Sequence, residues 1–195
     1  MASDDSVEAV VGRALHALQA AEVPYMLVGS FASAFHGSPR TTQDIDVVIA
    51  PTLGSLQKLI KQFPEDEYYV SRDAALQAYG AETLFNVVDF RTGWKIDFII
   101  CKSREYNVQE FARRQEAELL GARLYVASAE DVVLSKLEWA KQTESERQIR
   151  DVAGILRTKG ESLDREYLRR WIQPLNIREQ LVKALDEAGL TQAWI

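Results

Sequence analysis

The chain has 195 residues, of which 47% are hydrophobic, and a formal net charge of −6. This composition excludes intrinsic disorder as the default, and the acidic balance argues against a broad basic surface for nucleic acid. The single cysteine, Cys101, excludes an internal disulfide framework. No apolar run reaches the roughly 18 residues of a membrane span and the N-terminus has no basic start, so we expect a cytoplasmic protein without membrane contact.

The first fifty residues are predicted to form two helices and two buried strands. Apolar residues recur at helical spacing over residues 5–21, with Asp4, Asp5 and Ser6 as candidate N-caps. Tyr25 to Val28 is an apolar run short enough for a buried strand. Phe31 to His36 are compatible with a short helix that Gly37 and Pro39 end. After a polar loop, Asp44-Ile45-Asp46 leads into a second strand over residues 47–49.

The middle of the chain alternates predicted helices and strands. The expected helices are 52–63, 72–79 and 107–118, and the expected strands are 68–70, 83–90, 95–101 and 119–127, the last kinked at Gly121. The strands 83–90 and 95–101 flank Arg91-Thr92-Gly93, which has the turn chemistry of a hairpin. This hairpin is expected to bring Asp97 beside the strand that carries Asp44 and Asp46.

From Ser128 onward the pattern is wholly helical. Ser128 precedes Glu130-Asp131 as in a capping box, and further helices are expected over 144–158, 164–173 and 176–188, the last two divided by Pro174. We therefore predict an α/β (α+β) fold in which a mixed sheet is followed by a C-terminal helical bundle. The expected domains are residues 1–127 and 128–195.

Three aspartates on apolar strands indicate a cation site. Asp44 and Asp46 are two residues apart, so their side chains share one face of a strand. Asp97 lies between Ile96 and Phe98, where an unpaired carboxylate is costly. No basic residue is expected beside these carboxylates, and a shared hard cation such as Mg²⁺ would compensate their charge. The alternative is that the acidic pair is merely a solvated strand end.

Gly29-Ser30 directly follows the first predicted strand and indicates a phosphate site. A glycine at a strand end lets the backbone approach a ligand closely. The Ser30 hydroxyl and the amides that open the next helix can then hold a phosphate.

The order Gly-Ser, Asp-x-Asp and a later strand Asp resembles the polymerase-β-type nucleotidyltransferases, and within them the AbiEii-like toxin group. The resemblance covers roughly residues 23–157. It implies that Asp44, Asp46 and Asp97 are catalytic carboxylates that hold two metal ions, Mg²⁺ or Mn²⁺. It also implies that Gly29 and Ser30 hold the triphosphate of an NTP.

The resemblance extends into the helical half. There it implies that Lys136 contacts the triphosphate, from the side opposite Ser30, and that the helical acidic residue Asp151 completes the site. Read from the residues alone, Lys136 and Asp151 on neighbouring helices are more often a surface ion pair.

The expected function is metal-dependent nucleotidyl transfer from an NTP to an acceptor hydroxyl. The first domain would be catalytic and the second would complete the site. The end of an RNA, especially a tRNA, is the favoured acceptor, and a protein hydroxyl or a small molecule is the alternative. As a toxin, the chain would have an antitoxin protein as partner. The competing hypothesis is a non-catalytic module that binds a nucleotide or a partner and keeps the fold.

Overall fold

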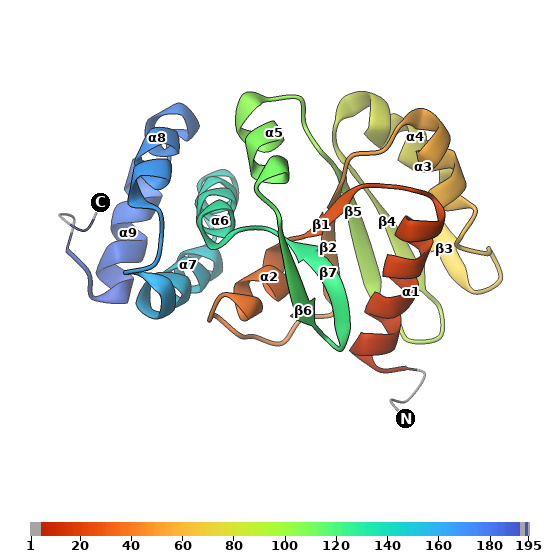
Figure 1. Ribbon diagram of the computed structural model, residues 1–195, viewed down its shortest axis with the longest axis horizontal. Helices are drawn as coiled ribbons and strands as arrows, with labels where there is room; N and C mark the ends of the chain where they lie inside the picture. Colours follow the sequence, from red (N-terminus) through yellow and green to blue (C-terminus); the bar gives the residue numbers. More distant parts are fainter. Residues whose placement is uncertain (1–4, 192–193, 195) are drawn as a thin grey trace. The chain divides into compact units, whose positions relative to one another are not determined.

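The computed structural model describes residues 5–191 and 194, which fall into two compact units (Figure 1). The first unit runs to Ser30 and resumes over Thr41–Val126. The second holds Phe31–Arg40 and the chain from Ala127 onward. Residues 31–40 therefore group with the C-terminal helices, whereas the predicted boundary at residue 127 assigned them to the sheet domain. The predicted assignment of catalysis to the first domain and of completing the site to the second stays a prediction.

The first unit is built on one mixed seven-stranded sheet in the order β3-β4-β5-β2-β1-β7-β6. The strands are β1 Tyr25–Leu27, β2 Asp44–Ile49, β3 Tyr68–Val70, β4 Leu84–Asp89, β5 Lys95–Ile100, β6 Gln115–Leu119 and β7 Ala122–Val126. The pairs β2/β5 and β1/β7 are parallel, and the other neighbours are antiparallel. The predicted fold class is confirmed, as is the hairpin of β4 and β5.

One face of the sheet carries the core of this unit. Alternate residues of β2, β4 and β5 are buried, namely Ile45, Val47, Ile49, Phe85, Val87, Ile96, Phe98 and Ile100. Phe63 packs its ring against Tyr68 and Phe98. Because side chains alternate along a strand, the remaining residues of β2 and β5 project from the opposite face. That opposite face carries the three aspartates.

Four helices accompany the sheet in the first unit: α1 Val7–Ala20, α3 Leu53–Ile60, α4 Arg72–Ala81 and α5 Glu105–Ala112. Ser6 caps α1 by accepting a hydrogen bond from the Ala9 amide, which satisfies one of the unpaired donors of the first turn. Asp4, another candidate cap, and the N-terminal start considered for a signal peptide lie outside the described residues. No helix among those described is long and apolar enough to cross a membrane.

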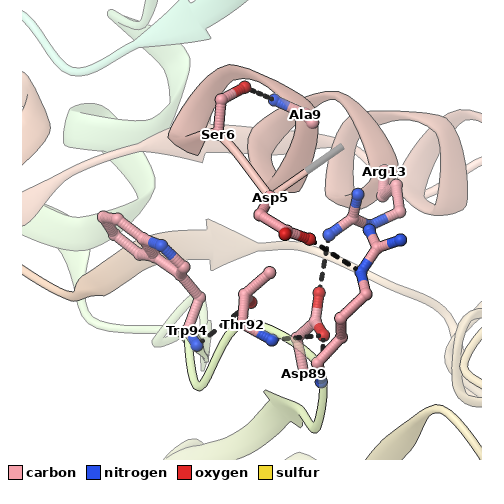
Figure 2. A network of polar contacts seen from close by, with 8 residues as sticks. Asp5, Ser6, Ala9, Arg13, Asp89, Thr92 and Trp94 are labelled. Carbon is pink, nitrogen blue, oxygen red and sulfur yellow. Dashed lines mark hydrogen bonds and ion pairs between the residues drawn. The ribbon is translucent and has the colours of Figure 1, made fainter. Parts of the chain in front are cut away.

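Helix α1 is tied to the β4–β5 hairpin by the ion pairs in Figure 2. Arg13 lies 2.6 Å from the buried carboxylate of Asp89, and Asp5 lies 3.0 Å from Arg91. Burial opposes ionisation of Asp89, but hydrogen bonds from Arg13 and from the Thr92 and Arg91 amides outweigh it and lower the pKa of Asp89. The hairpin turn is thus held through one ionised carboxylate.

Two cavities of 490 and 530 Å³ flank this network, and neither is lined by a predicted site residue.

The second unit is helical, as predicted. It contains α6 Ala129–Thr143, α7 Glu146–Lys159, α8 Arg165–Leu175 and α9 Arg178–Ala188, and α2 Gly29–Phe35 leads into it from the first unit. Its core consists of the apolar faces of these helices, including Val133, Leu137, Val152, Leu168 and Leu181. Buried Asp131 joins α6 to α8, because Ser128 and Tyr167 both donate hydrogen bonds to its carboxylate.

Two predictions of local structure are wrong. The helix expected over 107–118 ends at Ala112, and residues 115–119 form β6, which pairs with β7 through a turn at Leu120 and Gly121. Both turn residues have positive φ, so Gly121 makes the turn and does not kink a strand. Pro174 does not divide two helices, since it lies in the last turn of α8, and Asn176 in the left-handed conformation ends that helix.

Candidate functional site

The three predicted carboxylates come from the two central parallel strands β2 and β5. Asp46 lies opposite Asp97 in the register, and Asp44 lies opposite Lys95. Their neighbours Ile45 and Ile96 are buried on the other face, so the three aspartates share one face of the sheet. The expectation that Asp97 lies beside the strand of Asp44 and Asp46 is confirmed. Their chemical roles stay predictions.

Gly29 is packed directly against Asp46. It follows β1 with a φ of +60°, a conformation that favours glycine, and a Cβ atom added there would collide with Asp46 Oδ2. The Val28 amide donates a 2.9 Å hydrogen bond to the Asp46 carbonyl, which fixes the end of β1 against the start of β2. Ser30 follows in the first turn of α2 and is buried. Gly29, Ser30 and Asp46 therefore form one compact corner of the first unit.

The expectation that no basic residue accompanies the carboxylates is wrong. Lys95 Nζ lies 2.9 Å from Asp97 Oδ2 and 3.4 Å from Asp44 Oδ1. The hydrogen bond with Asp97 raises the pKa of Lys95 above its ordinary value, so the ammonium is charged at neutral pH. The signal was in the sequence, because Lys95 is two residues before Asp97 and must share its face.

Asp44, Asp46 and Asp97 supply the carboxylate oxygens that magnesium prefers as ligands. Their side chains are not, however, arranged around a common metal position. Among residues 5–191 and 194, no group of three or more His, Cys, Asp and Glu side chains is arranged to hold an ion. Within the same described part of the chain, the buried Oδ1 of Asp97 accepts no hydrogen bond. A buried carboxylate oxygen without a partner is costly and calls for a ligand. The residues therefore fit a magnesium ion for two reasons. Their oxygens are suitable ligands, and Asp97 Oδ1 has no other partner within the described residues.

Asn86 is a further polar residue on this face that the sequence reading did not single out. It lies on β4 opposite Asp97, and its side chain is exposed. The available signal was that Asn86 is the one polar residue within the apolar run of residues 84–88. Asp46, Asp97 and Asn86 thus form one row across three adjacent strands.

The remaining two site residues, Lys136 and Asp151, lie in the second unit and are bound to each other. Lys136 Nζ donates 2.8 Å hydrogen bonds to Asp151 Oδ2 and to Gln148 Oε1, and both side chains of the ion pair are less than a tenth exposed. Arg40 Nε lies 3.3 Å from the same Asp151 oxygen. The alternative of an ion pair on neighbouring helices is confirmed, but the pair is buried and does not lie at the surface. The proposed contact of Lys136 with a triphosphate stays a prediction.

His36 directly follows α2, and its contacts indicate a structural role. Its ring is buried and Nε2 donates a 2.8 Å hydrogen bond to the Ala127 carbonyl, also in the second unit. Burial lowers the pKa of His36 below its ordinary value, so the ring is neutral at pH 7. A neutral ring with this bond fixes the start of the helical segment.

Solved structures of low sequence identity share this fold. The complex of ANT(2″)-Ia with adenylyl-2″-tobramycin superposes with a TM-score of 0.60 at 15% identity, over 88% of this chain and 98% of that one. The fold is that of the nucleotidyltransferases. The lincomycin-bound lincosamide antibiotic adenylyltransferase LnuA matches with a TM-score of 0.54 at 12% identity, over 77% and 97% of the two chains.

A third structure of this nucleotidyltransferase fold is an antigenic nucleotidyltransferase-like protein from Paracoccidioides brasiliensis. It has a TM-score of 0.53 and 20% identity, over 99% of this chain and 97% of that one. No protein-family model and no curated protein matches the sequence. The polymerase-β-type fold is thus supported by structure, and membership of the AbiEii-like group stays a prediction.

Proposed function

We propose that the chain transfers a nucleotidyl group from an NTP to an acceptor hydroxyl in a reaction that depends on Mg²⁺ or Mn²⁺. One observation carries the proposal. The parallel pairing of β2 with β5 brings Asp46, which packs against Gly29, beside Asp97, and it leaves Asp44 on the same face of the sheet. In a nucleotidyltransferase fold, this arrangement would suit binding of a metal ion and a phosphate.

Asp44, Asp46 and Asp97 would hold the metal in this reaction. Bound there, magnesium would supply charge stabilisation for the entering and leaving oxygens of an in-line displacement. Gly29 gives the triphosphate close access to the backbone beside Asp46, and the Ser30 hydroxyl holds a phosphate oxygen. Lys136 and Asp151 complete our proposed set of nucleotide-binding residues.

Asp97 is also the proposed proton acceptor. The acceptor hydroxyl attacks the α-phosphorus, a new P–O bond forms, and the bond to the β-phosphate oxygen breaks. Pyrophosphate leaves with that bonding electron pair, and the hydroxyl proton passes to the Asp97 carboxylate. The Asp97 Oδ1 atom suits this role, because no residue among those described donates a hydrogen bond to it.

Two different observations favour different classes of acceptor. The AbiEii-like resemblance favours the end of an RNA, especially a tRNA, and a toxin role with an antitoxin partner in the cytoplasm. The antibiotic adenylyltransferases ANT(2″)-Ia and LnuA have this fold and favour a small-molecule hydroxyl as the second candidate. A protein hydroxyl is the third.

The experiment that separates these acceptors uses each of the four NTPs labelled at the α-phosphate. The protein is incubated with Mg²⁺ and with total RNA, total protein, tobramycin or lincomycin in separate reactions. Label in one fraction identifies the acceptor class. Mg²⁺-dependent binding of an NTP with no transfer to any acceptor would favour the non-catalytic module, and no binding at all would contradict both hypotheses.

A further inference from the structure

Lys95 lies on the same face of the sheet as the three aspartates. Its ammonium contacts Asp97 Oδ2 at 2.9 Å and Asp44 Oδ1 at 3.4 Å, and so bridges the two strands β5 and β2. Lys95 lies opposite Asp44 in the register and two residues before Asp97 on its own strand. The backbone therefore directs all three side chains to the same side, and the bridge is a consequence of the sheet.

The ammonium binds two of the carboxylates that a metal ion at this face would use, Asp97 and Asp44. Three carboxylates and one ammonium leave a formal charge of −2, which equals the charge that one divalent cation neutralises. A metal bound at Asp44 and Asp97 would lie within a few ångströms of the ammonium, and because two cations at that distance repel each other, we expect the ammonium to leave both carboxylates. The absence of a gathered metal site among the described residues agrees with side chains collected around Lys95 instead.

A purely structural ion pair accounts poorly for this geometry. The Lys95 side chain is 36% exposed, so its contribution to stability is small. The Asp97 side chain is only 13% exposed, yet its Oδ1 atom has no hydrogen-bond partner within the described chain. An arrangement that served stability alone would give the buried Oδ1 atom of Asp97 a hydrogen-bond donor. The arrangement is instead one that a ligand completes.

We propose that Lys95 is a displaceable counter-ion of the carboxylate site. It holds Asp44 and Asp97 together in the metal-free protein, and it moves to the triphosphate when the nucleotide arrives with its metal. The lysine side chain suits this exchange, because its ammonium is a compact charge with three donors on a flexible stem. Lysine also binds phosphate well as a point charge. The proposal rests on the proposed nucleotidyl transfer and adds a specific nucleotide contact to it.

This exchange makes the site selective for a metal that comes with a nucleotide. A free metal ion must break both ion pairs of Lys95 and leaves the ammonium without an anionic partner. A metal–nucleotide complex breaks the same pairs but offers the triphosphate as the new partner. Lys95 therefore weakens binding of the free metal and strengthens binding of the complex, so its removal must act on the two affinities in opposite directions.

The test measures two affinities in Lys95→Gln and Lys95→Met, both of which remove the charge from a half-exposed position. The first is that of Mn²⁺ alone, followed by titration calorimetry. The second is that of a non-hydrolysable α,β-methylene NTP in saturating Mg²⁺, for the base that binds the wild type best. Lys61→Gln is the matched control, because Lys61 is an exposed lysine of the same unit at the end of α3, away from the site.

We expect Mn²⁺ to bind about tenfold more tightly to the Lys95 variants, since the competing charge is gone. We expect the nucleotide to bind about tenfold more weakly, since a charge-assisted contact is lost. Lys61→Gln should change neither. Equal affinities in wild type and variants, or a change of the same sign in both, would overturn the counter-ion role while leaving the proposed function standing. A wild type that binds neither ligand would overturn both.

Discussion

Asp46 and Asp97 lie directly opposite each other on the parallel strands β2 and β5. Neighbouring residues of a parallel pair project their side chains to the same side, so the register places two carboxylates from distant parts of the sequence beside each other. Asp44 on β2 lies on the same face, and Asn86 on β4 extends the row of Asp46 and Asp97. The proposed chemistry depends on this alignment.

Replacement of Asp46 by Asn should abolish transfer without loss of the fold. The change removes one metal-binding charge and also removes repulsion from Asp97, so the metal-free protein should be as stable as the wild type or more stable. We expect activity to fall by about a hundredfold or more. The measurements are transfer from a labelled NTP and the melting temperature. Asp66→Asn, which changes an exposed loop residue of the same unit, is the control, and full activity in Asp46→Asn would contradict the assignment.

Gly29→Ala should damage both stability and activity, because two separate costs apply. A residue with a side chain at positive φ costs about 1–2 kcal/mol. The added methyl group also collides with Asp46 Oδ2, and such overpacking costs typically about 1–3 kcal/mol more. Gly93→Ala isolates the first cost, since Gly93 also has positive φ but open space around it. Urea denaturation should show the larger loss for Gly29→Ala, and equal losses would mean that Asp46 simply moves aside.

The sequence predicted the carboxylate face because strand alternation and register follow simple rules. It did not predict β6, because Gln115–Leu119 reads as a polar continuation of α5 and its partner strand is identified only in the folded chain. The role of Lys95 was overlooked although its spacing from Asp97 was visible. The burial of Lys136 could not be foreseen, since it depends on the packing of α6 against α7 and on Arg40 from a distant segment.

The buried pair of Lys136 and Asp151 should matter strongly for folding. Lys136→Met leaves Asp151 with Arg40 as its remaining charged contact among the described residues, and we expect a loss of about 3 kcal/mol in the free energy of unfolding. The double variant Lys136→Met/Asp151→Leu also removes the carboxylate that has lost its closest partner, and it should recover much of that loss. Chemical denaturation measures both. If the double variant is no more stable than Lys136→Met, the cost does not come from the unpaired charge.

The same double variant tests whether Lys136 and Asp151, beyond their structural pairing, contribute to nucleotide binding. If Lys136 contacts the triphosphate, the folded double variant should bind NTP about tenfold more weakly or worse, since a charged contact is lost. Titration of the folded protein with NTP in Mg²⁺ makes the comparison. Unchanged affinity would remove Lys136 from the nucleotide-binding set and leave it as the buried partner of Asp151.

Acidification should destabilise the second unit through His36. Burial lowers the pKa of His36 below its ordinary value of 6.5, and the nearby charge of Lys159 acts in the same direction, whereas the bond to Ala127 and the charge of Glu130 oppose it. As the pH falls, the His36 side chain is therefore protonated at a higher pH in the unfolded chain than in the folded one. The stability contributed by neutral His36 is present above pH 6.5 and is lost as the pH falls through the lower folded value.

The measurement for His36 is the melting temperature between pH 7.5 and pH 5, with both limits about one unit or more from the ordinary histidine pKa. His36→Gln should show a shallower decline than the wild type. The same substitution at His16, an exposed histidine on α1, should leave the decline unchanged. Parallel curves for wild type and His36→Gln would contradict the assignment of the acid sensitivity to this residue.

The central claim is tested most directly by transfer and pyrophosphate release measured together in the wild type and in Asp97→Asn. With Mg²⁺, the preferred NTP and the acceptor identified by labelling, the wild type should release one pyrophosphate for each nucleotidyl group attached. Asp97→Asn should bind the nucleotide in a folded state but lose both products, as should the wild type in excess EDTA. Equal product formation by Asp97→Asn, or transfer that persists without a divalent cation, would contradict the account.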